Sequence, residues 1–214
     1  MRKHYLDNIR WLTVVLVVFY HVLYMYNAEG VAGGLGKITD LKVQYYDLYL
    51  NFVYPWLMPI LFIVSGITSR LYLESHSNRE FIRSRTAKLL VPSTIGLFVF
   101  QFIQGYINMS LSNALDQMAE VPWFVKYLIM AIPGQGVLWF AQMLWLFSVM
   151  LVGVRKLEKD RGWQLGKKVN LPILLLLTGA VWLSAQSGNT PVVVVYRFGL
   201  YNTLYFLGYF IFSH

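Results

Sequence analysis

The uncharged stretch WLTVVLVVFYHVLYMYNA, from Trp11 to Ala28, decides the fold because its 18 residues are almost wholly apolar. A helix of roughly 17 to 25 apolar residues spans the hydrocarbon core of a bilayer. Five more stretches of 17 to 28 residues lack Asp, Glu, Lys and Arg: 48–69, 89–115, 127–154, 169–196 and 198–214. Each has room for one crossing, so the sequence predicts an all-α, polytopic helical membrane protein with about six transmembrane helices.

The composition excludes a soluble enzyme. Hydrophobic residues make up 57% of the 214 residues and charged residues 13%, with a mean hydropathy of +0.51. An average soluble domain is about 45 to 50% apolar and about 25% charged. The chain has no cysteine, so disulfides and thiolate metal sites are excluded, and no metal site is predicted.

The net charge of +8 comes from bases that lie between the hydrophobic stretches. This arrangement favours a bilayer over nucleic acid as the partner, because cytoplasmic loops collect Lys and Arg. With the amino terminus inside, 13 of the 18 bases face the cytoplasm and only three, Lys37, Lys42 and Lys126, lie outside. The thirteen are Arg2, Lys3, Arg70, Arg79, Arg83, Arg85, Lys88, Arg155, Lys156, Lys159, Arg161, Lys167 and Lys168. The amino terminus is therefore predicted to be cytoplasmic.

The expected spans are residues 9–26, 46–68, 89–107, 137–154, 171–186 and 192–212. Pro55 and Pro59 predict a kink or a local break in the second span, because each proline removes a backbone donor. The second half of the segment from Arg70 to Lys88 has the pattern of an amphipathic helix that leads to Pro92 and the third span.

Arg10 and His21 are ionisable residues of the first span, where burying a charge costs about 2.5 to 3.5 kcal/mol. They are eleven residues apart, which at 100° per residue is within 20° of three turns, so both lie on one helical face about 16 Å apart along the axis. Asp7, three residues before Arg10, belongs to the same face and is a candidate partner for it. The alternatives are a snorkelling arginine at the interface and a hydrogen-bonded packing histidine.

His21 is also a candidate general base, because imidazole titrates near neutrality. No Gly-x-Ser-x-Gly or His-Glu-x-x-His motif competes with it. Arg197 is the other charge predicted inside a span, and it is a candidate cavity residue. Ser65-Gly66 is expected to let the second span approach the first closely, as small residues do between membrane helices.

Three motifs in order resemble the integral-membrane acyltransferase-3 family. The first is the opening from Tyr5 to His21, with an Arg and a His separated by ten residues. The second is Leu61-Phe-Ile-Val-Ser65-Gly66, and the third is the basic stretch from Phe81 to Pro92. The segments Leu-Asp-Asn-Ile-Arg and Leu-Val-Pro within these motifs most resemble the branch of the family that includes glucan-succinylating membrane proteins.

The resemblance implies a multi-pass enzyme of the bacterial inner membrane, an acyltransferase for groups other than aminoacyl groups. It implies transfer of an acetyl or succinyl group from cytoplasmic acyl-CoA, a co-substrate rather than a tightly bound cofactor, to a hydroxyl of a carbohydrate or other envelope acceptor. His21 is then the catalytic imidazole and Arg10 helps to hold the donor. Arg83, Arg85 and Lys88 face CoA, although ordinary cytoplasmic bases would give the same pattern.

Members of that family usually have about ten spans, so residues 1–214 are expected to be a single acyltransferase domain truncated at its carboxyl end. Two other classes stay open. A small-molecule transporter also uses a polar stripe and helices interrupted by proline. A membrane scaffold would need no intramembrane Arg10, His21 or Arg197. The acyl group, the acceptor and the oligomeric state do not follow from the sequence.

Overall fold

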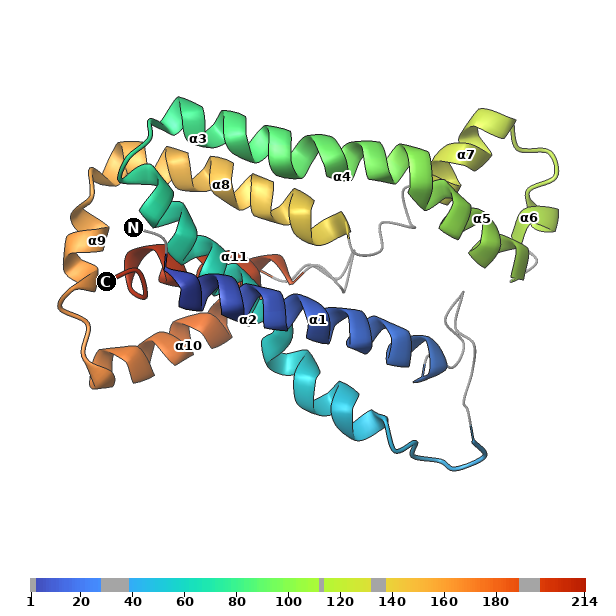
Figure 1. Cartoon of the computed structure of the whole chain (residues 1–214). Coiled ribbons are helices and arrows are strands. Elements are labelled where there is room, and N and C mark those ends of the chain that lie inside the picture. Colours follow the sequence, from blue (N-terminus) through green and yellow to red (C-terminus); the bar gives the residue numbers. More distant parts are fainter. Residues whose placement is uncertain (1–2, 28–38, 112–113, 132–137, 189–196) are drawn as a thin grey trace. The chain divides into compact units, whose positions relative to one another are not determined.

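The computed structural model describes residues 3–27, 39–111, 114–131, 138–188 and 197–214, and the regular elements within them are all helices, joined by turns (Figure 1). A helix satisfies the backbone N–H and C=O groups within one segment, as the bilayer core requires. The helices are α1 (His4–Asn27), α2 (Asp47–Leu73), α3 (Asn78–Arg85), α4 (Val91–Gly96), α5 (Phe102–Leu111), α6 (Ala114–Gln117), α7 (Trp123–Ala131), α8 (Trp139–Glu158), α9 (Arg161–Gly166), α10 (Leu171–Ser187) and α11 (Phe198–Phe210), with π-helical segments η1 (Thr86–Leu90) and η2 (Leu97–Gln101).

The prediction of an all-α membrane protein is confirmed. Within the described residues, four helices are long and apolar enough to cross a bilayer: His4–Tyr26, Asp47–Leu73, Asn78–Ile107 and Trp139–Glu158. They correspond to the first four predicted spans. The last two predicted spans are also helical but shorter, with 17 residues in α10 and 13 in α11.

α2 runs without interruption through Pro55 and Pro59, so the local break that the two prolines allowed does not occur. Membrane helices tolerate proline where other groups satisfy the freed backbone atoms.

The third span begins earlier than predicted, because α3 continues through η1 into α4. The Ser77 hydroxyl accepts from the Glu80 amide at 3.3 Å, and the Ser77 amide donates to the Glu80 carboxylate at 2.8 Å, which forms a capping box at the start of α3. η1 lies just before Pro92, whose ring conflicts with the carbonyl four residues earlier in a regular helix. The wider π turn moves that carbonyl, at Lys88, away from the ring.

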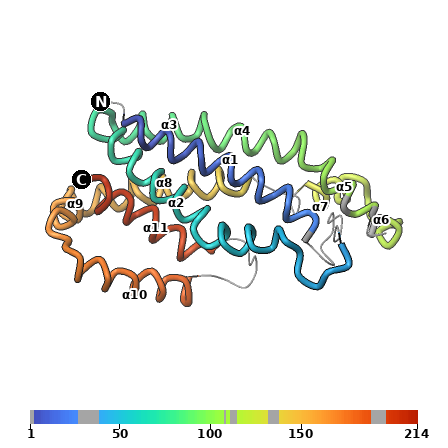
Figure 2. Tube along the Cα trace, turned by 60° about the horizontal axis from the view of Figure 1, so that its bottom comes forward, coloured from blue at the N-terminus to red at the C-terminus, as the bar shows by residue number. Residues whose placement is uncertain are grey.

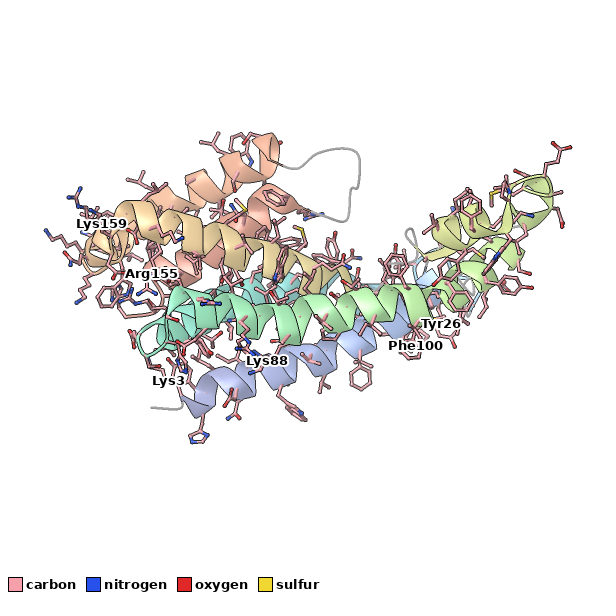
Figure 3. The ribbon with its side chains drawn as sticks, turned by 90° about the horizontal axis from the view of Figure 1, so that it is seen from above. Lys3, Tyr26, Lys88, Phe100, Arg155 and Lys159 are labelled. Atoms are coloured by element: carbon pink, nitrogen blue, oxygen red, sulfur yellow. The ribbon has the colours of Figure 1, made fainter. Side chains whose placement is uncertain are left out.

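The chain divides into two compact units: unit 1 comprises 1–10, 58–90 and 141–214, and unit 2 comprises 11–57 and 91–140. Fifteen of the eighteen bases and five of the ten acids belong to unit 1, so unit 1 carries a net charge of +10 and unit 2 a net charge of −2. Figure 3 shows three of these bases, Lys3, Arg155 and Lys159, at the end of unit 1 where α2 turns into α3.

The core of unit 1 forms where α2 crosses α11. A Cβ on Gly66 would overlap the Tyr205 carbonyl oxygen, and a Cβ on Gly208 would overlap the Ile63 carbonyl oxygen, so the two backbones touch. Gly66 therefore lets α2 approach α11 closely, and the expectation that it lets α2 approach the first span is wrong. α11 also lies beside α10 (Figure 2), with Gly188 against Gly199. In unit 2, α5 meets α7 closely at Gly105 in the same way.

Candidate active site

Three residues with hydroxyl groups lie on one face of α2 and form what we call the hydroxyl cluster: Ser65, Thr68 and Ser69. The Thr68 hydroxyl donates to the Ser65 carbonyl oxygen at 3.1 Å, and the Ser69 hydroxyl donates to the same oxygen at 2.7 Å. A carbonyl oxygen has two lone pairs, so this acceptor is filled. Both hydroxyl oxygens are thereby left with their own lone pairs directed at other donors.

Two arginines from other helices supply those donors. Arg10 of α1 donates from Nη2 to the Thr68 Oγ1 at 3.2 Å, and Arg85 of α3 donates from Nη2 to the Ser69 Oγ at 2.9 Å. Thr68 and Ser69 are adjacent residues, so their bonds bring the two guanidiniums near one another. We call Arg10 and Arg85 the arginine pair. Each uses one of its five N–H donors on the hydroxyl cluster, and such a pair favours an anion.

Tyr205 of α11 also contacts the hydroxyl cluster. Its hydroxyl lies 2.8 Å from the Ser69 Oγ and 3.4 Å from the Ser148 Oγ of α8, and all three side chains are fully buried. Ser69 gives its only proton to Ser65, and Ser148 gives its own to the Leu144 carbonyl. The Tyr205 hydroxyl therefore donates to Ser69, which makes Ser69 an acceptor for both Tyr205 and Arg85.

The three predicted CoA-facing bases do not converge in the structure. Arg85 is half-buried in the cluster, with its guanidinium 5.1 Å from the ring centroid of Phe81, whereas Arg83 and Lys88 are exposed. The π segment η1 contributes to this, because its wider turn changes the angular position of Lys88 relative to Arg85.

Asp7 and Arg197 are the other predicted candidates with charge. Asp7 lies half-buried on α1, one turn before Arg10. Arg197 is the residue that directly precedes α11, so it lies at the start of that helix and not inside it as predicted. The helix begins later than the hydropathy pattern suggested.

His21 lies on the part of α1 that belongs to unit 2, and its side chain is half-buried. Its Nδ1 is 2.8 Å from the carbonyl oxygen of Val17. A carbonyl oxygen only accepts, so Nδ1 carries the proton in this contact, and Nε2 of the neutral ring has an available lone pair. The ring of Tyr20 meets the imidazole edge-on, with 5.7 Å between the centroids.

Thr68, Ser69, Ser148 and Tyr205 are the polar residues of the cluster that the sequence analysis missed. The signal available for the first two was the spacing Ser65, Thr68, Ser69, which places three hydroxyls on one face of an otherwise apolar helix. No sequence pattern linked that face to Ser148 or Tyr205, which are 79 and 136 residues away from Ser69.

A second polar cluster joins α2 to α9 and α11 in unit 1. Arg70, which is 7% exposed, donates to the Asp160 carboxylate at 2.6 Å and to the Tyr209 hydroxyl at 3.3 Å. Its guanidinium also lies 4.0 Å from the centroid of the Trp163 ring. Through these contacts Arg70 connects α2 to α9 and α11, so we assign it a structural role.

The comparisons with known proteins agree with the motifs. A family model described as an acyltransferase domain, that of the acyltransferase-3 family, matches residues 3–214. No curated protein and no solved structure matches the chain. Because the family model covers nearly all of the chain, including the arginine pair, the hydroxyl cluster and His21, the chain belongs to the acyltransferase-3 family of membrane acyltransferases.

Proposed function

We propose that this chain transfers an acyl group of the acetyl or succinyl type from cytoplasmic acyl-CoA to a hydroxyl group of a carbohydrate or other envelope acceptor, in the plasma membrane of a bacterium. Membership of the family supports acyl transfer. The observation that carries the rest is the contact of His21 Nδ1 with the Val17 carbonyl, which leaves Nε2 as a base on a membrane helix.

In the proposed reaction, Nε2 of His21 takes the proton of the acceptor hydroxyl while the hydroxyl oxygen attacks the thioester carbonyl carbon. The carbon–sulfur bond then breaks, and the CoA thiolate leaves. Transfer of the proton from the imidazolium to that thiolate restores neutral His21. The contact with Val17 fixes the tautomer through both steps, because Nδ1 keeps its own proton throughout.

The arginine pair is proposed to hold the donor. Arg10 and Arg85 are positioned by Thr68 and Ser69 and keep further N–H groups for an anion, as phosphate or carboxylate recognition requires. Arg83 and Lys88, exposed on the same continuous helix as Arg85, are proposed to meet the CoA phosphates at its solvent-facing part. Along α1 alone, Arg10 and His21 are about 16 Å apart.

The test uses the full chain in lipid nanodiscs with acetyl-CoA or succinyl-CoA and the β-glucose oligosaccharide cellopentaose. The chain has no cysteine, so a thiol reagent reports only released CoA. We expect CoA release that depends on the sugar, with the product ester seen by mass spectrometry. His21→Ala should lower the rate by at least about 100-fold, the usual contribution of a general base.

His76→Ala is the matched control, because His76 is an exposed histidine in the turn after α2 and should have no effect. Undiminished release from His21→Ala at an equal protein level would contradict the proposed base. Sugar flux into vesicles without any release of CoA would instead favour the transporter.

A further inference from the structure

We propose that Tyr20, Tyr24 and Tyr54 form a stacking platform for a pyranose ring of the acceptor, which rests on the proposed function and names its substrate class. The three residues belong to unit 2, as does His21. The ring of Tyr20 stacks with that of Tyr24 at a centroid distance of 5.8 Å and an interplanar angle of 16°, and with that of Tyr54 at 5.9 Å and 24°. The result is a row of three nearly parallel rings, which we call the tyrosine row.

The tyrosine row adjoins the proposed base. Tyr20 contacts the imidazole of His21 edge-on, and Tyr24 follows His21 by three residues on the same helix. α1 ends at Asn27, six residues after His21, so the imidazole lies only about 9 Å along the axis from the end of the helix. In the predicted orientation this is the outer end, which is the side from which an envelope carbohydrate approaches.

Tyr24 is exposed, but it lies on the face of α1 that contains buried residues and not on a face that would contact lipid. Tyr24 follows Thr13 by eleven residues and Val17 by seven, each within 20° of whole turns, so it continues the stripe of α1 that contains buried Leu6 and Thr13. The exposed apolar residues Trp11, Phe19 and Val22 lie on other sides of the helix. Tyr24 is nevertheless 43% exposed and Tyr54 44% exposed. The rings of Tyr24 and Tyr54 are therefore accessible near the end of α1, although Tyr24 lies on the face of that helix that contains buried residues.

Ring faces are the right chemistry for a pyranose. The face of an aromatic ring carries partial negative charge. A β-glucose ring, with its hydroxyls equatorial, presents C–H groups of partial positive charge on both of its faces. A sugar would stack on the exposed ring of Tyr24 or Tyr54, because Tyr20 lies between them, and its equatorial hydroxyls would then be directed away from the ring face. Tyr20 in turn contacts His21. An open-chain polyol has the same hydroxyls and no such face.

The test measures sugar binding to the chain in nanodiscs without acyl-CoA, so it does not depend on turnover. Isothermal titration gives the affinity for cellopentaose, and saturation-transfer NMR shows which sugar protons contact the protein. We expect transfer to the ring C–H protons and a dissociation constant about 5- to 10-fold higher in Tyr24→Leu and Tyr54→Leu. Tyr24→Phe and Tyr54→Phe should stay within about twofold of the native chain, because the ring is kept, and sorbitol should not compete.

Tyr45→Leu is the matched control, since Tyr45 is a tyrosine of unit 2 that is 72% exposed and lies outside the row. Equal losses in Tyr45→Leu and Tyr24→Leu, or unchanged affinity in both Leu variants of the row, would overturn the platform. Sugar binding that depends on the row in a chain without acyl transfer would support the platform and refute the proposed function. Acyl transfer with an unchanged Michaelis constant for sugar in Tyr54→Leu would refute the platform and leave the proposed function standing.

Discussion

At the scale of single residues, Ser69 positions Arg85, one member of the arginine pair. Its hydroxyl accepts from both Arg85 and Tyr205 and donates to Ser65. Ser69→Ala removes all three bonds and leaves the fully buried Tyr205 hydroxyl without its strongest acceptor. We expect this substitution to lower the free energy of unfolding by about 1 to 3 kcal/mol and to raise the Michaelis constant for acyl-CoA. Thermal unfolding in detergent and CoA release measure the two effects.

A double-mutant cycle with Tyr205→Phe tests the hydrogen bond between the Tyr205 and Ser69 hydroxyls. If the two hydroxyls bond one another, Tyr205→Phe should cost much less in the Ser69→Ala background than in the native chain, with a coupling energy of about 1 to 2 kcal/mol. Ser75→Ala, in the exposed turn after α2, should change neither property. Additive effects of the two substitutions would show that the Tyr205 and Ser69 hydroxyls do not stabilise one another.

The charged residues of the candidate site were predictable at this scale, and its hydroxyls were not. Arg10 and His21 stand out because charge or imidazole in an apolar span is costly, so the sequence alone identifies them. Serine and threonine carry no such cost, since each satisfies itself on its own helix, as Ser148 does on Leu144. The bond from Ser69 to Tyr205 depends on which helices pack, and hydropathy does not contain that information.

At the scale of helices, glycines decide which pairs come together. α2 and α11 touch through Gly66 and Gly208, so a side chain at either position conflicts with the opposite backbone. Gly66→Ala should therefore destabilise the chain by about 1 to 3 kcal/mol, through forced separation of the two helices. Gly179→Ala is the control, because nothing lies within 4 Å of its added Cβ and alanine favours a helix over glycine. A Gly66→Ala chain that melts like Gly179→Ala would contradict the close crossing.

The positions of the helices could be predicted from the sequence, but their packing partners could not. The four longest helices lie where uncharged stretches of sufficient length lie, because length and hydropathy are properties of a single segment. The partner of Ser65-Gly66 was mistaken, since a small residue marks a close approach without naming the helix that approaches. The π segment before Pro92 could not be predicted either, because its effect on side-chain direction cannot be read from a regular 3.6-residue period.

At the scale of the whole molecule, the segregation of bases into unit 1 makes the predicted orientation testable. The native chain has no cysteine, so a single introduced cysteine is the only thiol to be labelled. Ser75→Cys and Lys159→Cys lie in exposed turns of unit 1, and Asp40→Cys and Glu120→Cys are exposed positions of unit 2. On spheroplasts, a membrane-impermeant maleimide should label the two cysteines of unit 2 at once and those of unit 1 only after permeabilisation. The proposed mechanism depends on this result, because its proposed donor, acyl-CoA, is cytoplasmic and the arginine pair belongs to unit 1. The reverse labelling pattern would place those guanidiniums on the side without donor and would refute their proposed role.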